Sequence, residues 1–129
     1  MLPFTVVLKS GLPVYEQVLY AAKKAALTGQ LRAGDPFPSV RTLCQELRIN
    51  PNAAHKVVTA LIDEGLLEVR SGIGTVVAQA PAATREQRRQ LLEADVERLV
   101  VEARTMGLEV DDVLHAVRAH WQRLGRTRR

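Results

Sequence analysis

The chain has 129 residues, a formal net charge of +4, 47% hydrophobic residues and a single cysteine, Cys44. This length suits one ordinary domain, or a small domain with an appendage, and it is sufficient to bury a core. One cysteine excludes a disulfide framework or a thiolate metal cluster within the chain, and we interpret Cys44 as a small core residue. The sequence has no apolar run long enough to cross a membrane and no basic leader of a signal peptide, so we expect a cytoplasmic protein without a membrane partner.

The positive charge is spread over the chain rather than concentrated in one part. Residues 1–80 contain eight Lys and Arg against six Asp and Glu, and residues 81–129 contain ten against eight. A net positive charge is compatible with a polyanionic partner such as nucleic acid. Because each part carries only +2, affinity for DNA must come from the placement of a few cations, with a modest salt dependence for each monomer.

The chain begins with a short β-prone run and continues with an amphipathic helix. Residues 9–11 interrupt the run at residues 4–8, and both an edge strand and a loose arm remain open there. From Leu12 onward the apolar spacing predicts a helix, with Pro13 in its first turn and Gly29 as the residue that ends it. The apolar face of this helix contains Val14, Val18, Ala22 and Ala25.

A connector follows, and it is expected to run extended into the next helix. Leu31 is predicted to be a buried anchor, residues 34–35 to form a turn, and Pro36 and Pro38 to keep the backbone extended. Ser39 is well placed to cap the next helix. The start of a helix can also bind a phosphate, because the positive end of the helix dipole lies there. A cap alone and a cap that also contacts phosphate are both compatible with the sequence.

Two short amphipathic helices joined by a tight turn are predicted between Ser39 and Glu64. The apolar stripe of the first contains Val40, Leu43, Cys44 and Leu47, and that of the second contains Ala54, Val57, Val58, Leu61 and Ile62. Asn50 and Pro51 give the second helix an N-cap followed by a proline at its first position. The opposite face presents Asn52, His55, Lys56 and Thr59. The pattern predicts a helix-turn-helix motif that sets its second helix in the DNA major groove, although an ordinary helical hairpin shares the same stripes.

A β-hairpin is predicted directly after the second helix, which ends at Gly65. Residues 66–70 and 75–78 are its strands, and Gly72 and Gly74 in the turn permit positive φ or a close approach by another backbone. Following a helix-turn-helix, such a hairpin is a wing that reaches the adjacent minor groove. In any other context it is only a hairpin.

The run from Leu12 to Ala78, with PVYEQV, TGQLRAGDPFPSVRTL and INPNAAHKVVTALIDEGLLEVRSGIGTVV, resembles the winged-helix domain of the GntR family of bacterial transcription regulators. The resemblance implies that Arg41 contacts a phosphate or a base and that the start of the second helix of the pair faces the major groove. It also implies that Gly72 reaches the minor groove, between Arg70 and Thr75. The candidate DNA-binding residues are Ser39, Arg41, Asn50, Asn52, His55, Lys56, Thr59, Arg70, Gly72, Gly74 and Thr75.

The sequence departs from the family pattern at three positions. Many members carry arginine where this chain has Pro51 and His55, so a bidentate contact from arginine to guanine is not available there. In this respect the chain is similar to the short YtrA-type branch, and its base preference should differ accordingly. Arg48 replaces a frequent glycine. If the backbone there needs positive φ, strain of about 1 kcal/mol follows.

Residues 79–83 are interpreted as a linker, after which two amphipathic helices are predicted. Thr84 and Gln87 form a capping-box pattern at the start of the first, which Gly107 ends, and Leu108 starts the second. Two helices of this size cannot close a core alone, so they pack on a second copy, which we favour, or form a cap on the winged domain. The candidate dimerisation residues are Leu92, Val96, Leu99, Ala103, Met106, Val113, Leu114, Val117 and Trp121.

We therefore expect a mainly α fold with a small β-wing. The expected parts are an arm at 1–11, a winged helix-turn-helix domain at 12–78, a linker at 79–83, a helical dimerisation region at 84–125 and a basic tail at 126–129. The expected function is a homodimeric, sequence-specific DNA-binding regulator that acts on a pseudo-palindromic operator. The resemblance implies that it is a repressor and that its targets are its own operon and transporter genes.

The main alternative is a winged-helix module that binds another protein and not DNA. We expect neither an enzyme nor a cofactor. Asp111 and His115 lie one helical turn apart, but the third ligand that a metal site needs is missing from the sequence around them. No segment marks a small-molecule effector site.

Overall fold

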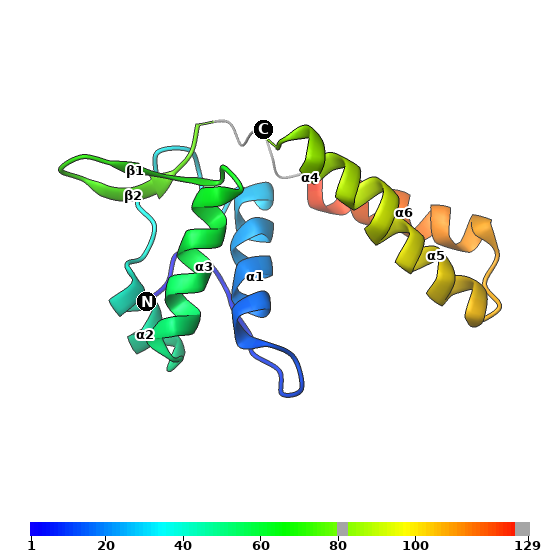
Figure 1. Cartoon of the computed structure of the whole chain (residues 1–129), viewed down its shortest axis with the longest axis horizontal. Helices are drawn as coiled ribbons and strands as arrows, with labels where there is room; N and C mark the ends of the chain where they lie inside the picture. The colour runs from blue at the N-terminus through cyan, green and yellow to red at the C-terminus, as the bar shows by residue number, and fades with distance from the viewer. Residues whose placement is uncertain (80–82, 126–129) are drawn as a thin grey trace. The chain divides into compact units, whose positions relative to one another are not determined.

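The computed structural model describes residues 1–79 and 83–125, which form two compact units divided between these ranges. The first unit contains α1 (Val14–Thr28), α2 (Val40–Leu47), α3 (Pro51–Asp63), β1 (Leu67–Arg70) and β2 (Gly74–Val77) (Figure 1). The second contains α4 (Arg85–Arg89), the π-helix η1 (Gln90–Asp95), α5 (Val96–Thr105) and α6 (Val110–Gly125). The mainly helical winged fold matches the expectation from the sequence. The proposed basic tail and most of the proposed linker lie outside the described residues.

The core of the first unit lies between α1, α2 and α3. The buried side chains of α1 and α3 come from the apolar stripes that the sequence predicts, at helical spacing, and Leu43 joins them from α2. Val18, Leu43 and Val57 are completely buried, with 0% exposure each. Burial of a branched aliphatic side chain stabilises a fold by about 1.5–3 kcal/mol. This packing therefore holds α3 by one face and leaves its other face in solvent.

The N-terminal segment is an anchored irregular arm, neither a regular strand nor a loose end. Phe4 is buried in the core and its ring stacks on Phe37, with 5.7 Å between the ring centroids. Gln17 of α1 holds the arm with its side-chain amide. Its Oε1 accepts from the Lys9 backbone N–H at 2.7 Å, and its Nε2 donates to the Lys9 carbonyl at 2.9 Å.

Strands β1 and β2 form an antiparallel hairpin whose register runs from Leu67 opposite Val77 to Arg70 opposite Gly74. The connector before α2 lies along the outer edge of β2. The Phe37 N–H donates to the Thr75 carbonyl at 2.9 Å, and the Val77 N–H donates to the Asp35 carbonyl at 2.8 Å. The extended connector was predicted, but its pairing with the hairpin was not. The hairpin is thereby tied to the segment that leads into α2.

The turn between α2 and α3 contains a left-handed residue that is not glycine. Arg48 follows α2 with φ 55° and ψ 49°, and within residues 1–79 and 83–125 it is the one non-glycine residue with positive φ. The backbone does need positive φ here, as considered from the sequence. The left-handed conformation costs an L-residue roughly 1–2 kcal/mol.

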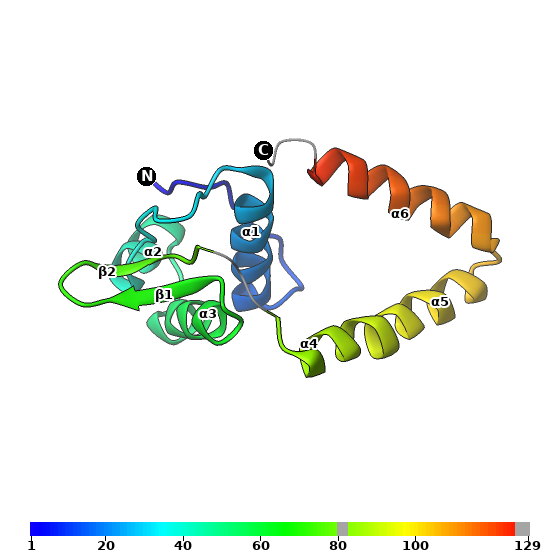
Figure 2. The ribbon, with the colours of Figure 1, turned by 90° about the horizontal axis from the view of Figure 1, so that it is seen from above.

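The second unit is a helical hairpin that stays open. Its start is confirmed as a capping box, because the Gln87 N–H donates to Thr84 Oγ1 at 3.0 Å and the Thr84 N–H donates to Gln87 Oε1 at 2.8 Å. The sequence predicted one continuous α-helix after this cap. The structure differs, because the π-helix η1 separates α4 from α5. Figure 2 shows that the α4–α5 rod and α6 diverge from their connection. No helix in the described part of the chain is long and apolar enough to cross a bilayer.

We predict that Arg48→Gly raises the free energy of unfolding by about 0.5–1 kcal/mol. Relief of the left-handed strain, roughly 1–2 kcal/mol, exceeds the roughly 0.4–1 kcal/mol by which glycine stabilises the unfolded chain. Urea denaturation measures the change. Arg48→Ala is the control, because alanine keeps the strain and should give no gain. A lower denaturation midpoint for Arg48→Gly than for the unchanged protein would contradict the prediction.

Candidate nucleic-acid interface

The start of α2 is capped by Ser39, as predicted. Ser39 Oγ accepts from the Thr42 N–H at 3.1 Å and donates to Thr42 Oγ1 at 3.0 Å. The hydroxyl is thus engaged in the cap as both acceptor and donor. The first backbone N–H groups of a helix have no intrahelical acceptor. An anion at this helix start would therefore meet the amides of Val40 and Arg41 rather than the serine hydroxyl.

The start of α3 also has the predicted cap. Asn50 Oδ1 accepts from the Asn52 N–H at 2.7 Å, and Pro51 occupies the first helical position. Asn52, His55 and Thr59 are exposed and follow one another at three- and four-residue spacing, which places them on one ridge. His55 Nδ1 lies 3.4 Å from Thr59 Oγ1. The ridge offers an amide, an imidazole and a hydroxyl, all able to hydrogen-bond to base edges.

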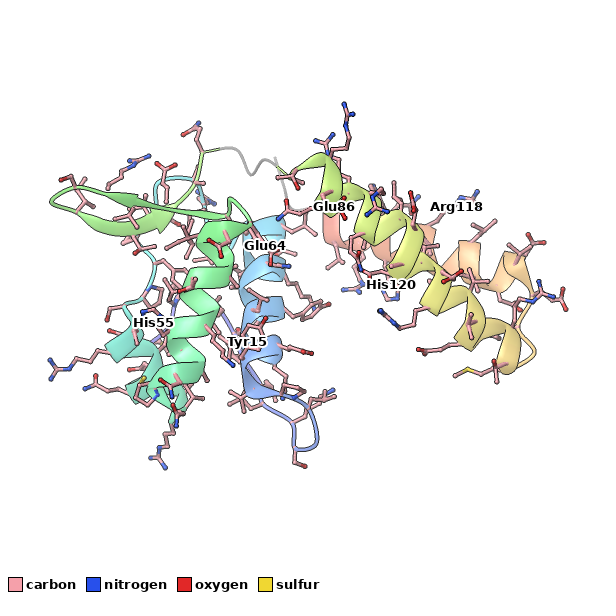
Figure 3. All side chains as sticks on the ribbon, in the orientation of Figure 1. Tyr15, His55, Glu64, Glu86, Arg118 and His120 are labelled. Carbon is pink, nitrogen blue, oxygen red and sulfur yellow. The ribbon has the colours of Figure 1, made fainter. Side chains whose placement is uncertain are left out.

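Lys56 belongs to the exposed surface of α3, but its side chain leans toward α1. Its Nζ lies 5.9 Å from the centroid of the Tyr15 ring. Figure 3 shows Tyr15 and His55 on opposite sides of α3. Lys56 therefore stands at the edge of the polar ridge, and a cation–π contact positions its ammonium group. Sequence reasoning did not identify Tyr15, because the contact joins residues far apart in the chain.

The arginines of the first unit differ in their surroundings. Arg70 on β1 is paired with Glu68, with 2.9 Å between Nε and Oε2. By contrast, no ion pair to Arg41 or Arg48 is present among the residues that the structure describes. Arg70 must leave Glu68, or share it, to contact a phosphate. The cations free to meet a polyanion therefore include two at the ends of α2.

The hairpin tip is exposed and has the backbone that its glycines permit. Gly72 has φ 77° and Gly74 has φ 113°, in the region that favours glycine. Between them stands Ile73, an exposed apolar side chain that sequence reasoning did not single out. Thr75 is half-buried, and its carbonyl accepts from Phe37, so this residue belongs to the frame of the hairpin.

The second unit leaves most of its apolar side chains in solvent. Of its described residues, Ala103 alone is buried, and Val113 is half-buried. A hollow of about 530 Å³ lies at the vertex of the hairpin, between α5 and the start of α6. Trp121 on α6 is 78% exposed. The other exposed members of the predicted dimerisation set are Leu92, Val96, Leu99, Met106, Leu114 and Val117.

The chain matches known regulators over its first unit and along most of its length. Residues 14–77 match the model of the family described as bacterial regulatory proteins, gntR family. The chain is 31% identical over 104 residues to the HTH-type transcriptional repressor YtrA of Bacillus subtilis. The aligned residues make up 80% of this chain and 80% of YtrA. It is 26% identical to the uncharacterized HTH-type transcriptional regulator YhcF of the same organism, over 85% of this chain and 91% of the relative.

A solved structure supports the fold over both units. The crystal structure of a transcriptional antiterminator from Listeria monocytogenes aligns with a TM-score of 0.82 at 21% identity and covers 95% of this chain and 92% of that one. This likeness supports the observed fold, in which a helix pair and a hairpin are followed by further helices. The chain belongs to the GntR family and is a DNA-binding transcription regulator, not an enzyme.

Proposed function

We propose that the protein is a homodimeric, sequence-specific repressor that binds a pseudo-palindromic operator. The observation that carries this proposal is the exposed ridge of Asn52, His55 and Thr59 on a helix whose opposite face is locked in the core. A relative similar along most of its length is named a repressor. Family membership argues against the alternative of a winged module that binds only protein. Residues 12–78 would bind DNA and residues 84–125 would form the dimer.

In this proposal α3 reads bases and its neighbours hold the DNA backbone. An asparagine side chain can make two hydrogen bonds to adenine, since its NH2 group donates to N7 and its oxygen accepts from the N6 amino group. Asn52 is therefore the main base reader in this proposal. Pro51 and His55 cannot supply the arginine–guanine contact that many relatives make. Arg41 and the amides at the start of α2 would meet phosphates, and the Gly72 tip would enter the minor groove. Asn50, Lys56, Thr59, Arg70, Gly74 and Thr75 complete the proposed surface.

The apolar surface of the second unit supports assembly with a second copy. Leu99, Val117 and Trp121 project into solvent from helices that diverge, so that the hairpin cannot cover them by itself. Removal of their remaining apolar surface from water would stabilise a dimer by about 25 cal/mol for each Å² that becomes buried. A two-fold dimer would present two α3 helices about one DNA turn apart, ~34 Å. Such spacing fits two half-sites of a pseudo-palindrome.

By resemblance to the short branch of the family, the regulated genes would be the protein's own operon and neighbouring transporter genes. The protein would act in the cytoplasm. An inducer, where one acts, would bind in the groove of the dimer. Such a ligand would have to change the spacing of the two α3 helices to release DNA.

We predict different binding defects for Arg41→Ala and Asn52→Ala. Arg41→Ala should weaken binding to every duplex, because a phosphate contact carries no sequence information. Asn52→Ala should reduce the preference for a duplex that the unchanged protein selects from a random pool, relative to an unrelated one. Each loss should amount to about 1–3 kcal/mol. Binding titrations at several salt concentrations measure both effects.

Matched controls for these variants lie in the last two turns of α1 and just after its end. Lys24→Gln removes one exposed cation, and Gln30→Ala removes one exposed amide. Both controls should bind the two duplexes like the unchanged protein. The proposed surface is wrong if Arg41→Ala and Asn52→Ala also bind both duplexes normally.

We predict that Leu99→Asp converts the dimer to a monomer at micromolar concentration and weakens operator binding, because a buried carboxylate would face the partner. Val101→Asp is the matched control. Val101 is also exposed, but it lies about 200° around α5 from Leu99, outside the proposed interface. Size-exclusion chromatography with light scattering measures the mass. A monomeric unchanged protein, or a Leu99→Asp variant that remains dimeric, would refute this interface.

A further inference from the structure

Arg48 occupies a backbone position that suits glycine better than arginine. Its φ of 55° is positive, and its side chain is exposed at the end of α2. Glycine adopts this conformation without a steric penalty. A strained residue persists where the surrounding structure enforces it, and such residues cluster at functional sites. The backbone conformation alone does not explain an arginine here, which points to a functional role for its side chain.

The position of Arg48 places it on the surface that faces DNA in the proposed function. Arg41 and Gln45 are exposed on one face of α2, and Arg48 is exposed directly after the helix ends. The seven residues from Arg41 to Arg48 correspond to ~10.5 Å along the helix axis. Arg48 also stands two residues before Asn50, the cap of α3. The two arginines thus bracket α2 and are far enough apart to meet different phosphates.

The segment that contains α3 carries little positive charge of its own. Residues 49–69 contain a single cation, Lys56, and its ammonium lies over the Tyr15 ring. Glu46, the one carboxylate of α2, pairs with the amino group of Met1 at 3.0 Å rather than with Arg48. A helix that carries so little positive charge of its own needs cations from its neighbours to neutralise DNA phosphates. Arg48 is the nearest exposed arginine along the chain.

We propose that Arg48 binds a backbone phosphate of the DNA next to the half-site, as a second phosphate clamp beside Arg41. This inference rests on the proposed function and adds a contact residue to it. A guanidinium group offers a planar set of donors that suits phosphate oxygens. The contact holds the turn before α3 against the backbone and so sets the depth of α3 in the groove.

The test compares three substitutions in the full-length protein with the control Lys24→Gln. Arg48→Gly removes both the charge and the strain, Arg48→Gln removes only the charge, and Arg48→Lys keeps the charge. Dissociation constants are measured across a salt series for two duplexes. One duplex is selected by the unchanged protein from a random pool, and the other is unrelated in sequence. Thermal unfolding is followed in parallel.

Arg48→Gly and Arg48→Gln should weaken binding to both duplexes by about tenfold and lower the slope of log affinity against log salt by about 1. Arg48→Lys should keep most of that slope, and Lys24→Gln should leave affinity and slope unchanged. Arg48→Gly should unfold at a higher temperature than the unchanged protein, so that its weaker binding cannot result from misfolding.

The inference is overturned if Arg48→Gly binds both duplexes with the affinity and salt slope of the unchanged protein. It is also overturned if the loss is confined to the selected duplex at an unchanged slope, which would indicate a base contact. Failure of the proposed function looks different. In that case the unchanged protein itself shows no salt-dependent affinity for either duplex, and both proposals are lost.

Discussion

The face that α3 presents to solvent is decided by how its other face packs. Ala54, Val57 and Leu61 are almost completely buried against α1 and α2, and each lies one helical turn from the next. Rotation of α3 by a single residue position, about 100°, would expose this stripe and bury polar side chains without partners. The ridge of Asn52 and His55 is therefore held outward by the packing of the opposite face of α3.

The hairpin depends on the same core through a second link. The connector before α2 pairs with β2, where the Phe37 N–H bonds to Thr75, and the Phe37 ring packs into the core beside Phe4. Two residues later, Ser39 caps α2. One short segment thus fixes both the hairpin and the helix start that would meet phosphates. A displacement of the hairpin strains α2, so that the two proposed DNA contacts are held in a constant relation.

The helix starts could be predicted from residues close together in the sequence. Contacts between distant segments could not be predicted in this way. The caps at Ser39, Asn50 and Thr84 were foreseen, because a cap depends on residues within three positions. The pairing of Phe4 with Phe37 joins segments that no sequence periodicity connects. Pro36 was expected only to keep the backbone extended, and it also bridges to Val76 at an edge, where proline is tolerated. The widened turns of η1 also left no local signal.

The two parts of the chain carry equal net charge but offer it differently to a polyanion. In the second unit Arg89 lies between Glu86 and Glu93, whose carboxylates raise its pKa, and Arg98 lies near Asp95. Their positive potential is largely cancelled within a few ångströms, so that few DNA counterions would be released there. In the first unit the described ion pairs leave Arg41 and Arg48 uncompensated at the two ends of α2. Among the described residues, Arg41 and Arg48 are therefore the unpaired arginines that lie next to α3 along the chain, a placement that the total charge of the sequence does not reveal.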